Sequence, residues 1–195
     1  MRLPAKIDDV GEYLADVTAL EAAGASAIWV DDKGLDPWVL LGAMAAVTHR
    51  LSLGCVITSP ELELAAMLKP ITALHTLSRG RVAVGLALNN SEEQAVAALS
   101  AAGSRIFTTG SEFGAADGVI CEGESASQFA RAGDGHIEVW VAIPFPPDRE
   151  AWARTLNQYE AAGAGGVIVP WNARVVDLLR NPEADDRTDL LISTG

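Results

Sequence analysis

The sequence contains few of the residues that build metal sites and disulfide frameworks. Cysteine occurs twice and histidine three times, and no pair of them has the spacing of metal ligands. Two cysteines that lie far apart in apolar stretches do not form a disulfide scaffold, so we expect reduced thiols in the core and no bound metal. The histidines do not allow a Ser-His-Asp or Cys-His arrangement either, which makes acyl-transfer hydrolysis a poor interpretation.

Positive charge is scarce as well. The chain has 14 basic and 26 acidic residues, a formal net charge of -12, and its only lysines are Lys6, Lys33 and Lys69. Such a chain repels nucleic acid and anionic lipid unless basic residues gather locally, and the sequence has no such cluster. Long apolar runs and an apolar leader are missing too. We therefore expect no nucleic-acid partner, no membrane partner and a cytoplasmic location.

Short apolar runs alternate with segments of helical spacing along the chain. A length of 195 residues, of which 49% are hydrophobic and 21% charged, predicts one globular domain over residues 1–195. Helices are predicted at 9–23, 37–48, 62–78, 91–102, 148–162 and 173–180, with an interruption at Pro70. Strands are predicted at 2–5, 27–30, 51–58, 81–88, 105–109, 118–121, 138–144 and 166–170.

Eight strands alternating with helices predict an α/β fold, a compact (β/α)8 TIM-type barrel. The chain is shorter than the barrel norm of about 250 residues. Only about eight residues separate the strands at 105–109 and 118–121, fewer than the roughly ten to twelve that a crossover helix needs. Either one crossover helix is missing, or the strand count is wrong and the sheet is an open doubly wound parallel sheet.

Several short motifs follow one another at regular spacing. They lie at Leu20–Asp32, Asp36–Leu41, Arg50–Gly54, Thr58–Pro60, Leu77–Arg81 and Ala116–Ile120. The first combines Glu-Ala-Ala-Gly at a helix end with Ile-Trp-Val-Asp in the next strand, and the second reads Asp-Pro-Trp-Val-Leu-Leu. In this order and spacing the chain resembles the bacterial luciferase-like flavin- and deazaflavin-dependent oxidoreductases and monooxygenases, as a shortened member. The resemblance covers residues 12–90 best.

The resemblance implies a flavin mononucleotide (FMN) or an 8-hydroxy-5-deazaflavin coenzyme at the carboxyl mouth of the barrel, where a small organic substrate would react. It also implies a homodimer through helices 37–48 and 62–78, and the apolar character of these helices on more than one face favours an interface. Barrel active sites form on the loops after the strands. Here those loops carry Asp31–Lys33, Thr58–Ser59, Asn89–Asn90, Thr108–Ser111, Glu124–Ser125, Phe145 and Trp171–Asn172.

The predicted cofactor-binding residues are Val56, Thr58, Asn89, Thr109, Gly110, Ser111 and Trp171. By resemblance, the loop at 109–111 holds the cofactor phosphate, and its hydroxyls and glycine N–H group can cradle an anion; a plain turn is the alternative. A non-proline cis peptide that supports the ring in relatives would fall near Val56–Ile57. The Asn89 amide can bond a flavin carbonyl. Trp171 either walls a planar cofactor or packs in the core.

Asp32 and Lys33 are the predicted catalytic residues, because deazaflavin-dependent relatives commonly have Asp-His at this position. Imidazole exchanges protons near neutral pH, whereas a lysine does so only when burial lowers its pKa. A solvated charged loop is the alternative interpretation. Three functions stay open: an oxidoreductase, a catalytically silent flavin-binding or cofactor-free protein of the same fold, and an isomerase with Asp32 and Lys33 as its acid–base pair.

Overall fold

A seven-stranded parallel sheet forms the centre of the computed structural model, which describes residues 1–4, 7–58, 64–87, 93–109, 115–122 and 137–180. The strands are β1 (Ala27–Asp31), β2 (Ser52–Ile57), β3 (Val82–Leu86), β4 (Arg105–Thr109), β5 (Gly118–Glu122), β6 (Glu138–Ala142) and β7 (Gly166–Ile168). Their spatial order equals their order in the chain, and every neighbouring pair is parallel. Each lies where the sequence predicts a strand.

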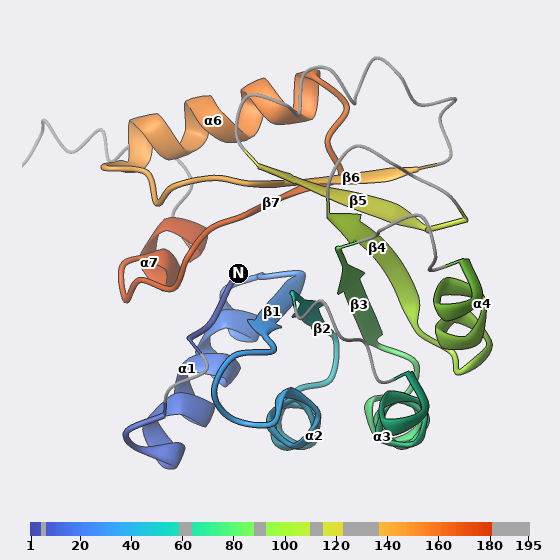
Figure 1. Ribbon diagram of the computed structural model, residues 1–195. Coiled ribbons are helices and arrows are strands. Elements are labelled where there is room, and N and C mark those ends of the chain that lie inside the picture. Colours follow the sequence, from blue (N-terminus) through green and yellow to red (C-terminus); the bar gives the residue numbers. More distant parts are fainter. Residues whose placement is uncertain (5–6, 59–63, 88–92, 110–114, 123–136, 181–195) are drawn as a thin grey trace, which may run out of the picture.

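Helices cover the outer face of this sheet. They are α1 (Val10–Ala22), α2 (Pro37–Val47), α3 (Leu64–Ser78), α4 (Glu93–Ala101), α6 (Arg149–Ala161) and α7 (Val175–Arg180). Figure 1 shows α1 to α4 along the outside of β1 to β4, with α6 over β6 and β7. α3 runs through Pro70 as one helix, so the predicted interruption is not a break. In the segments that the structure describes, no helix is long and apolar enough to cross a membrane.

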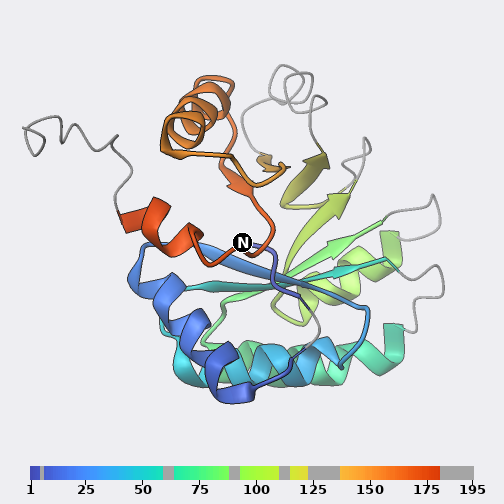
Figure 2. The same ribbon diagram turned by 90° about the vertical axis from the view of Figure 1, so that its left-hand side faces the viewer.

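The N-terminal segment joins the two edges of the sheet (Figure 2). Arg2 makes parallel bridges to Trp29 on β1 and to Pro170 just beyond β7. The Arg2 N–H donates to the Val169 carbonyl (2.8 Å), and the Trp171 N–H donates to the Arg2 carbonyl (2.9 Å). The predicted first strand is thus reduced to a single bridging residue, and the sheet curls into an incomplete barrel. An open doubly wound sheet is excluded, because its strand order reverses at a switch point.

The connection between β4 and β5 is short. Its described residues, 115–117, contain no helix. Asp117 holds them against β4: its backbone N–H donates to the Ile106 carbonyl (2.8 Å), and its carboxylate accepts a bond from the Ile106 N–H (2.7 Å). This arrangement agrees with the predicted loss of one crossover helix, while residues 110–114 lie outside the described part of the chain.

Side chains that point inward from the strands fill the interior of the barrel. They form one apolar cluster of Ala27, Trp29, Val56, Ala83, Phe107, Ile120, Trp140 and Ile168. The Trp29 ring meets Phe107 edge to face at 5.4 Å between ring centroids, and meets Trp140 at 6.3 Å. Gly54 makes room for the indole, because a Cβ there would lie 2.3 Å from Trp29 Cε3. The sequence analysis did not identify this aromatic interior.

Two charged residues lie at the amino end of the same interior. Arg105 and Glu138, the first residues of β4 and β6, form an ion pair. Trp140 Nε1–H donates to Glu138 Oε1 (2.6 Å), and the Arg105 guanidinium lies 5.2 Å from the Phe107 ring centroid. The ion pair closes the amino end of the interior, and the aromatic rings lie midway along the strands, so a ligand would bind at the carboxyl end.

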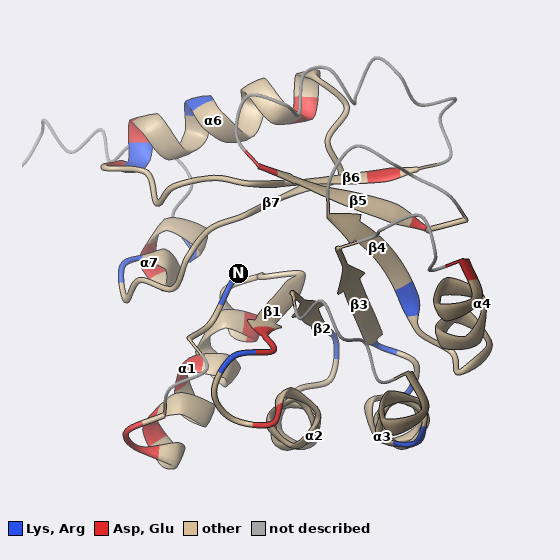
Figure 3. Ribbon diagram, viewed as in Figure 1, with Lys and Arg blue, Asp and Glu red and all other residues tan. Residues whose placement is uncertain are grey.

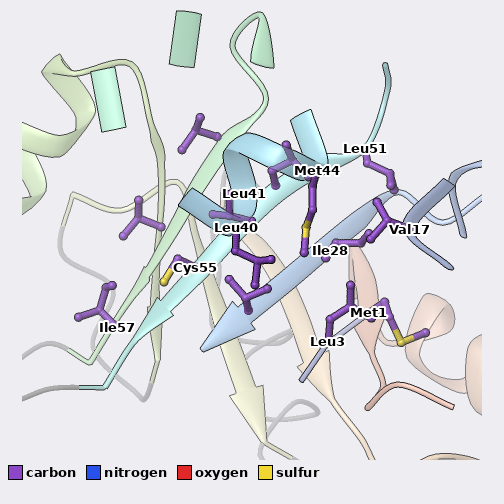
Figure 4. Close-up of a cluster of buried hydrophobic side chains, with 14 of the residues drawn as sticks. Met1, Leu3, Val17, Ile28, Leu40, Leu41, Met44, Leu51, Cys55 and Ile57 are labelled. Carbon is purple, nitrogen blue, oxygen red and sulfur yellow. The ribbon is translucent and has the colours of Figure 1, made fainter. Parts of the chain in front are cut away.

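A second, larger apolar cluster packs between the sheet and the helices. Figure 4 shows Met44 of α2 reaching toward Ile28 of β1, with Leu41 beside Cys55 of β2. Helix α2 owes its position to this burial, since Met44, Leu41 and Ile28 have almost no exposed surface.

One carboxylate fixes the turn between α2 and β2. Glu21 of α1 accepts hydrogen bonds from the backbone N–H groups of His49 (2.9 Å), Arg50 (2.6 Å) and Leu51 (3.0 Å). Arg81 donates from Nη1 to the Leu51 carbonyl (2.7 Å) on the other side of the turn. This network lies at the amino end of the strands, so it supports the fold and does not belong to the mouth.

Candidate functional site

The carboxyl ends of β1 and β2 bring Asp32 and Thr58 together. The Thr58 N–H donates to Asp32 Oδ2 (2.9 Å), and the Thr58 hydroxyl donates to Asp32 Oδ1 (2.7 Å). The Asp32 N–H in turn donates to the Val56 carbonyl (3.2 Å). Three predicted site residues therefore share one edge of the mouth. The two bonds from Thr58 fix the orientation of the Asp32 carboxylate.

Val56 contributes its backbone and its side chain to different places. Its carbonyl faces Asp32, whereas its side chain is buried in the aromatic interior. Every peptide bond between described residues is trans, so Val56–Ile57 is not the cis peptide that the resemblance places there. The predicted contact of Val56 with a cofactor stays a prediction.

The remaining described candidates lie apart from this edge. Lys33 is exposed in the turn after β1, without the burial that a proton-exchanging lysine requires. Thr109 ends β4, and its hydroxyl donates to the Leu86 carbonyl (3.4 Å). The Trp171 side chain is half-buried and packs against the outer apolar cluster. Asn89, Gly110 and Ser111 lie outside the described residues, so the predicted phosphate cradle stays a prediction.

A cavity of about 500 Å³ lies at the carboxyl ends of β5, β6 and β7. Its lining residues are Arg2, Glu122, Ala142, Ile143, Pro144, Ile168, Val169 and Pro170. Small-molecule sites are commonly cavities of about 300–1,000 Å³ with mostly apolar walls and a few polar groups. The cavity has this character, because Arg2 and Glu122 are its two charged residues among otherwise apolar ones.

Arg2 and Glu122 are not among the site residues predicted from the sequence. Arg2 stands between Met1 and Leu3, whose side chains are 6% and 3% exposed and belong to the outer cluster. Side chains alternate between the two faces of a strand, so this pattern alone places Arg2 on the inner face. Glu122 follows the apolar residues of β5 directly and ends that strand. Both positions could therefore have been recognised from the strand pattern.

Arg2 connects the cavity to β1. Its Nε–H donates to Asp31 Oδ1 (2.9 Å), and its Nη2 pairs with the same oxygen. The Arg2 and Asp31 side chains are 37% and 30% exposed, so solvent reaches both only in part. The pair links the edge that carries Asp32 to the cavity at β5–β7.

Beyond the cavity, side-chain contacts join the loops that follow β6 and β7. The Arg174 guanidinium lies 5.9 Å from the Phe145 ring centroid, and its Nη2 donates to the Pro147 carbonyl (2.9 Å). Arg149 forms an ion pair with Asp177 (2.6 Å) between α6 and α7. Since Pro147 and Phe145 follow β6 and Arg174 follows β7, these contacts hold the two loops at a fixed separation.

The described residues contain neither a candidate metal site nor a reactive thiol. Among the described residues, no group of three or more His, Cys, Asp or Glu side chains could hold a metal ion. Burial raises the pKa of the Cys55 thiol far above its ordinary value, and the charges of Asp32 and Asp31 raise it further. Burial also raises the pKa of Cys121 to about 11. Neither thiol is therefore a nucleophile near neutral pH.

The sequence profile of the luciferase-like monooxygenases matches residues 2–105, which include Arg2, Asp31, Asp32 and Thr58. The chain belongs to this family. An uncharacterized protein of Mycobacterium tuberculosis is 46% identical over 55 residues, which are 28% of this chain and 20% of that protein. An uncharacterized protein of Mycobacterium bovis matches to the same extent. The matched segment spans about a fifth of the length of these relatives.

Solved structures of luciferase-like enzymes and of other TIM barrels have a similar fold. The coenzyme F420-dependent tetrahydromethanopterin reductase of Methanopyrus kandleri superposes with a TM-score of 0.68 at 10% identity, over 92% of this chain and 95% of that one. A long-chain alkane monooxygenase superposes with a TM-score of 0.57 at 14% identity, over 79% and 62%. The phosphoribosyl anthranilate isomerase of Thermus thermophilus gives 0.53 at 13% identity, over 92% and 94%. At these identities the likeness shows the fold alone.

Proposed function

We propose that this chain is a flavin- or deazaflavin-dependent oxidoreductase that acts on a small organic substrate at the mouth of its barrel. The cavity beside Arg2 carries the proposal, because it has the volume and the apolar wall of a small-molecule site and lies at the carboxyl ends of the strands. Membership in the luciferase-like monooxygenase family supports the class of chemistry.

The residues of the mouth fit a flavin or deazaflavin ring system. Ala142, Ile168 and Pro170 offer apolar surface on which the face of the ring can rest. A bound flavin supplies hydride transfer and, once reduced, reaction with oxygen. The part of this chain is to hold the ring, to exclude water with the apolar wall, and to keep the Asp32 carboxylate oriented through Thr58 for proton exchange.

Titration of the protein with FMN and with the deazaflavin coenzyme tests the proposal. We expect saturable changes in the absorbance spectrum of one of the two cofactors. Ala142→Phe fills the cavity and is expected to weaken binding at least about tenfold, a loss of about 1.4 kcal/mol. Ala101→Phe, on an exposed alanine at the end of α4, is the matched control and should leave binding unchanged. Absence of saturable binding of both cofactors would refute the proposal.

A second candidate is a protein that binds the cofactor without turnover. The bonds from Thr58 already occupy both oxygens of Asp32, and Lys33 is exposed, so the predicted acid–base residues have the geometry of a structural loop. Hydride transfer from a nicotinamide coenzyme to the bound cofactor separates the two candidates, and for bound reduced FMN so does its reaction with oxygen. Rates that the protein does not change would favour the silent protein.

We also propose that the chain forms a homodimer through α2 and α3. Helix α2 has no charged residue along its length, and Figure 3 shows it without acidic or basic colour. Val39 on α2 and Leu77 on α3 are 74% and 67% exposed, and large exposed apolar surface usually marks an interface. Val39→Glu is expected to give a monomer in sedimentation velocity. Val10→Glu, on a valine of α1 that is 62% exposed, should leave a dimer. A monomeric wild-type chain would refute this proposal.

A further inference from the structure

Hydrogen bonds hold both the backbone and the side chain of Arg2. Its backbone is bonded on both sides, to the Val169 carbonyl (2.8 Å) and to the Trp171 N–H (2.9 Å). Its side chain donates to Asp31 through Nε and Nη2. An arginine has five N–H donors, and Nη1 has no hydrogen-bond partner among the described residues. Arg2 therefore lines the cavity with unused donors on a guanidinium whose orientation is fixed.

The location of Arg2 in the barrel favours an anion. When the N-terminal segment is counted as the first strand position, β6 and β7 take the seventh and eighth. In (β/α)8 barrels, the loops after strands seven and eight frequently form a phosphate site. Both of these loops line the cavity, through Pro144 after β6 and Pro170 after β7. The cation and the loops therefore meet at the same place.

The charges in the cavity are arranged asymmetrically. Glu122 lies on β5, and β6 and β7 separate it from Arg2. With strands about 4.8 Å apart, three steps give a separation of about 14 Å measured along the sheet. The apolar side chains of Ala142 and Ile168 lie on the intervening strands. Glu122 repels an anion at its end, whereas Arg2, whose charge Asp31 balances in part, can donate to an anion through Nη1, so a ligand with one anionic group has one favoured orientation.

We propose that the cavity binds an oxyanion group, a phosphate or a carboxylate, with Arg2 as the recognising residue and Asp31 as the positioning residue. The planar guanidinium matches the geometry of both oxyanions, and the uncharged remainder of the ligand rests on Ala142 and Ile168. This proposal rests on the proposed function, because the molecule that carries the oxyanion would be the cofactor or the substrate. The oxyanion is the phosphate of FMN or, if the loop at 109–111 holds that phosphate, the carboxylate of the substrate.

The first experiment compares FMN with riboflavin, which lacks only the phosphate. If the oxyanion is the cofactor phosphate, we expect wild-type protein to bind FMN at least about tenfold more tightly, as a charge-assisted pair implies. Arg2→Gln should reduce this ratio to about one. Arg174→Gln is the matched control, because it removes the same charge from a nearby arginine that does not line the cavity. It should preserve the ratio.

The second experiment tests a carboxylate on a separate molecule. Benzoate and inorganic phosphate are titrated into the protein, both free and loaded with riboflavin, and the melting temperature is recorded. If FMN and riboflavin bind equally, a rise with benzoate that is lost in Arg2→Gln and kept in Arg174→Gln assigns the oxyanion to the substrate. The free protein needs no flavin for this measurement. If neither flavin binds, the proposed function is refuted, while the response of the free protein to benzoate and phosphate still tests the anion site.

Glu122→Gln keeps the proposal testable if Arg2→Gln does not fold. Glu122 is exposed at the end of β5, so this change leaves the core intact, and loss of its charge should strengthen binding of the same oxyanion by about two- to fivefold. Oxyanion binding that depends neither on Arg2 nor on Glu122 would overturn the proposal. So would equal binding of FMN and riboflavin together with no response to benzoate or phosphate.

Discussion

Replacement of Gly54 by alanine tests the packing of the barrel interior. The added Cβ would lie 2.3 Å from Cε3 and 2.6 Å from Cζ3 of Trp29. Carbon atoms in contact normally lie about 3.5–4.0 Å apart, so the indole must withdraw by more than about 1 Å. Trp29 is 1% exposed and touches Phe107 and Trp140, so no free space receives it.

The expected loss of stability follows from two opposing effects. Overpacking a core costs about 1–3 kcal/mol, and a clash this close belongs at the upper end. Alanine gives the unfolded chain fewer conformations than glycine does, and this effect stabilises the folded protein by about 0.4–1 kcal/mol. We therefore expect Gly54→Ala to lower the free energy of unfolding by about 2 kcal/mol, measured by urea denaturation.

A matched substitution separates the clash from the general effect of alanine. Gly42 lies within α2, and a Cβ there would meet no atom within 4 Å. Gly42→Ala is expected to stabilise the protein by about 0.5–1 kcal/mol. In a Trp29→Leu background the cost of Gly54→Ala should fall by at least about 1 kcal/mol, because the ring that it meets is gone. A Gly54→Ala protein as stable as wild type would refute the packed interior.

Three further predictions concern the network at Glu21, the thiols and a helix cap. Burial acts to raise the pKa of Glu21, but the backbone N–H groups of the 49–51 turn outweigh it and hold this pKa below its ordinary value. The resulting stability is present above the ordinary glutamate pKa and is lost as the pH falls through the lower folded value. Glu21→Gln should therefore cost about 1–3 kcal/mol at pH 7 in urea denaturation, and the difference should shrink in acid; a constant difference would contradict this. Cys55 and Cys121 should resist a disulfide reagent at about pH 8 until the protein is unfolded, and fast labelling of the native protein would show that they are accessible. Asp36→Ala removes bonds from the N–H groups of Trp38 (2.9 Å) and Val39 (3.0 Å) and should cost about 1 kcal/mol in thermal unfolding, whereas Asp36→Asn should cost far less.

The order of strands and helices could be predicted because each element carries its own local signal. Four consecutive apolar residues in β1 predict a buried strand, and Asp36-Pro37 marks the start of α2. The count of strands, with one at 2–5, predicted a barrel, but the incomplete form of this barrel could not be predicted from the same signals. The join between its edges depends on Arg2 bonding at once to β1 and to the chain after β7, about 170 residues later in the sequence. Local periodicity does not report such a pairing.

The candidate site could be predicted only in part, for a related reason. The resemblance led to Asp32 and Thr58, and the structure places them in contact. It did not lead to Arg2 or Glu122, because neither belongs to a motif that was used for the resemblance. For Trp171 the sequence left a cofactor wall and packing in the core open, and its side chain packs on the outer cluster. The direction in which a loop side chain turns depends on tertiary contacts that the sequence does not reveal.

The ring pair of Trp29 and Trp140 gives the protein a built-in optical reporter. The two indoles lie 6.3 Å apart with their planes inclined at 72°, close enough for their electronic transitions to couple and to split into an exciton couplet in circular dichroism. Trp29 lies on β1 and Trp140 on β6, so the couplet arises only when these distant strands have come together around the interior. The couplet would thus report the curling of the sheet in unlabelled protein, separately from the formation of its helices.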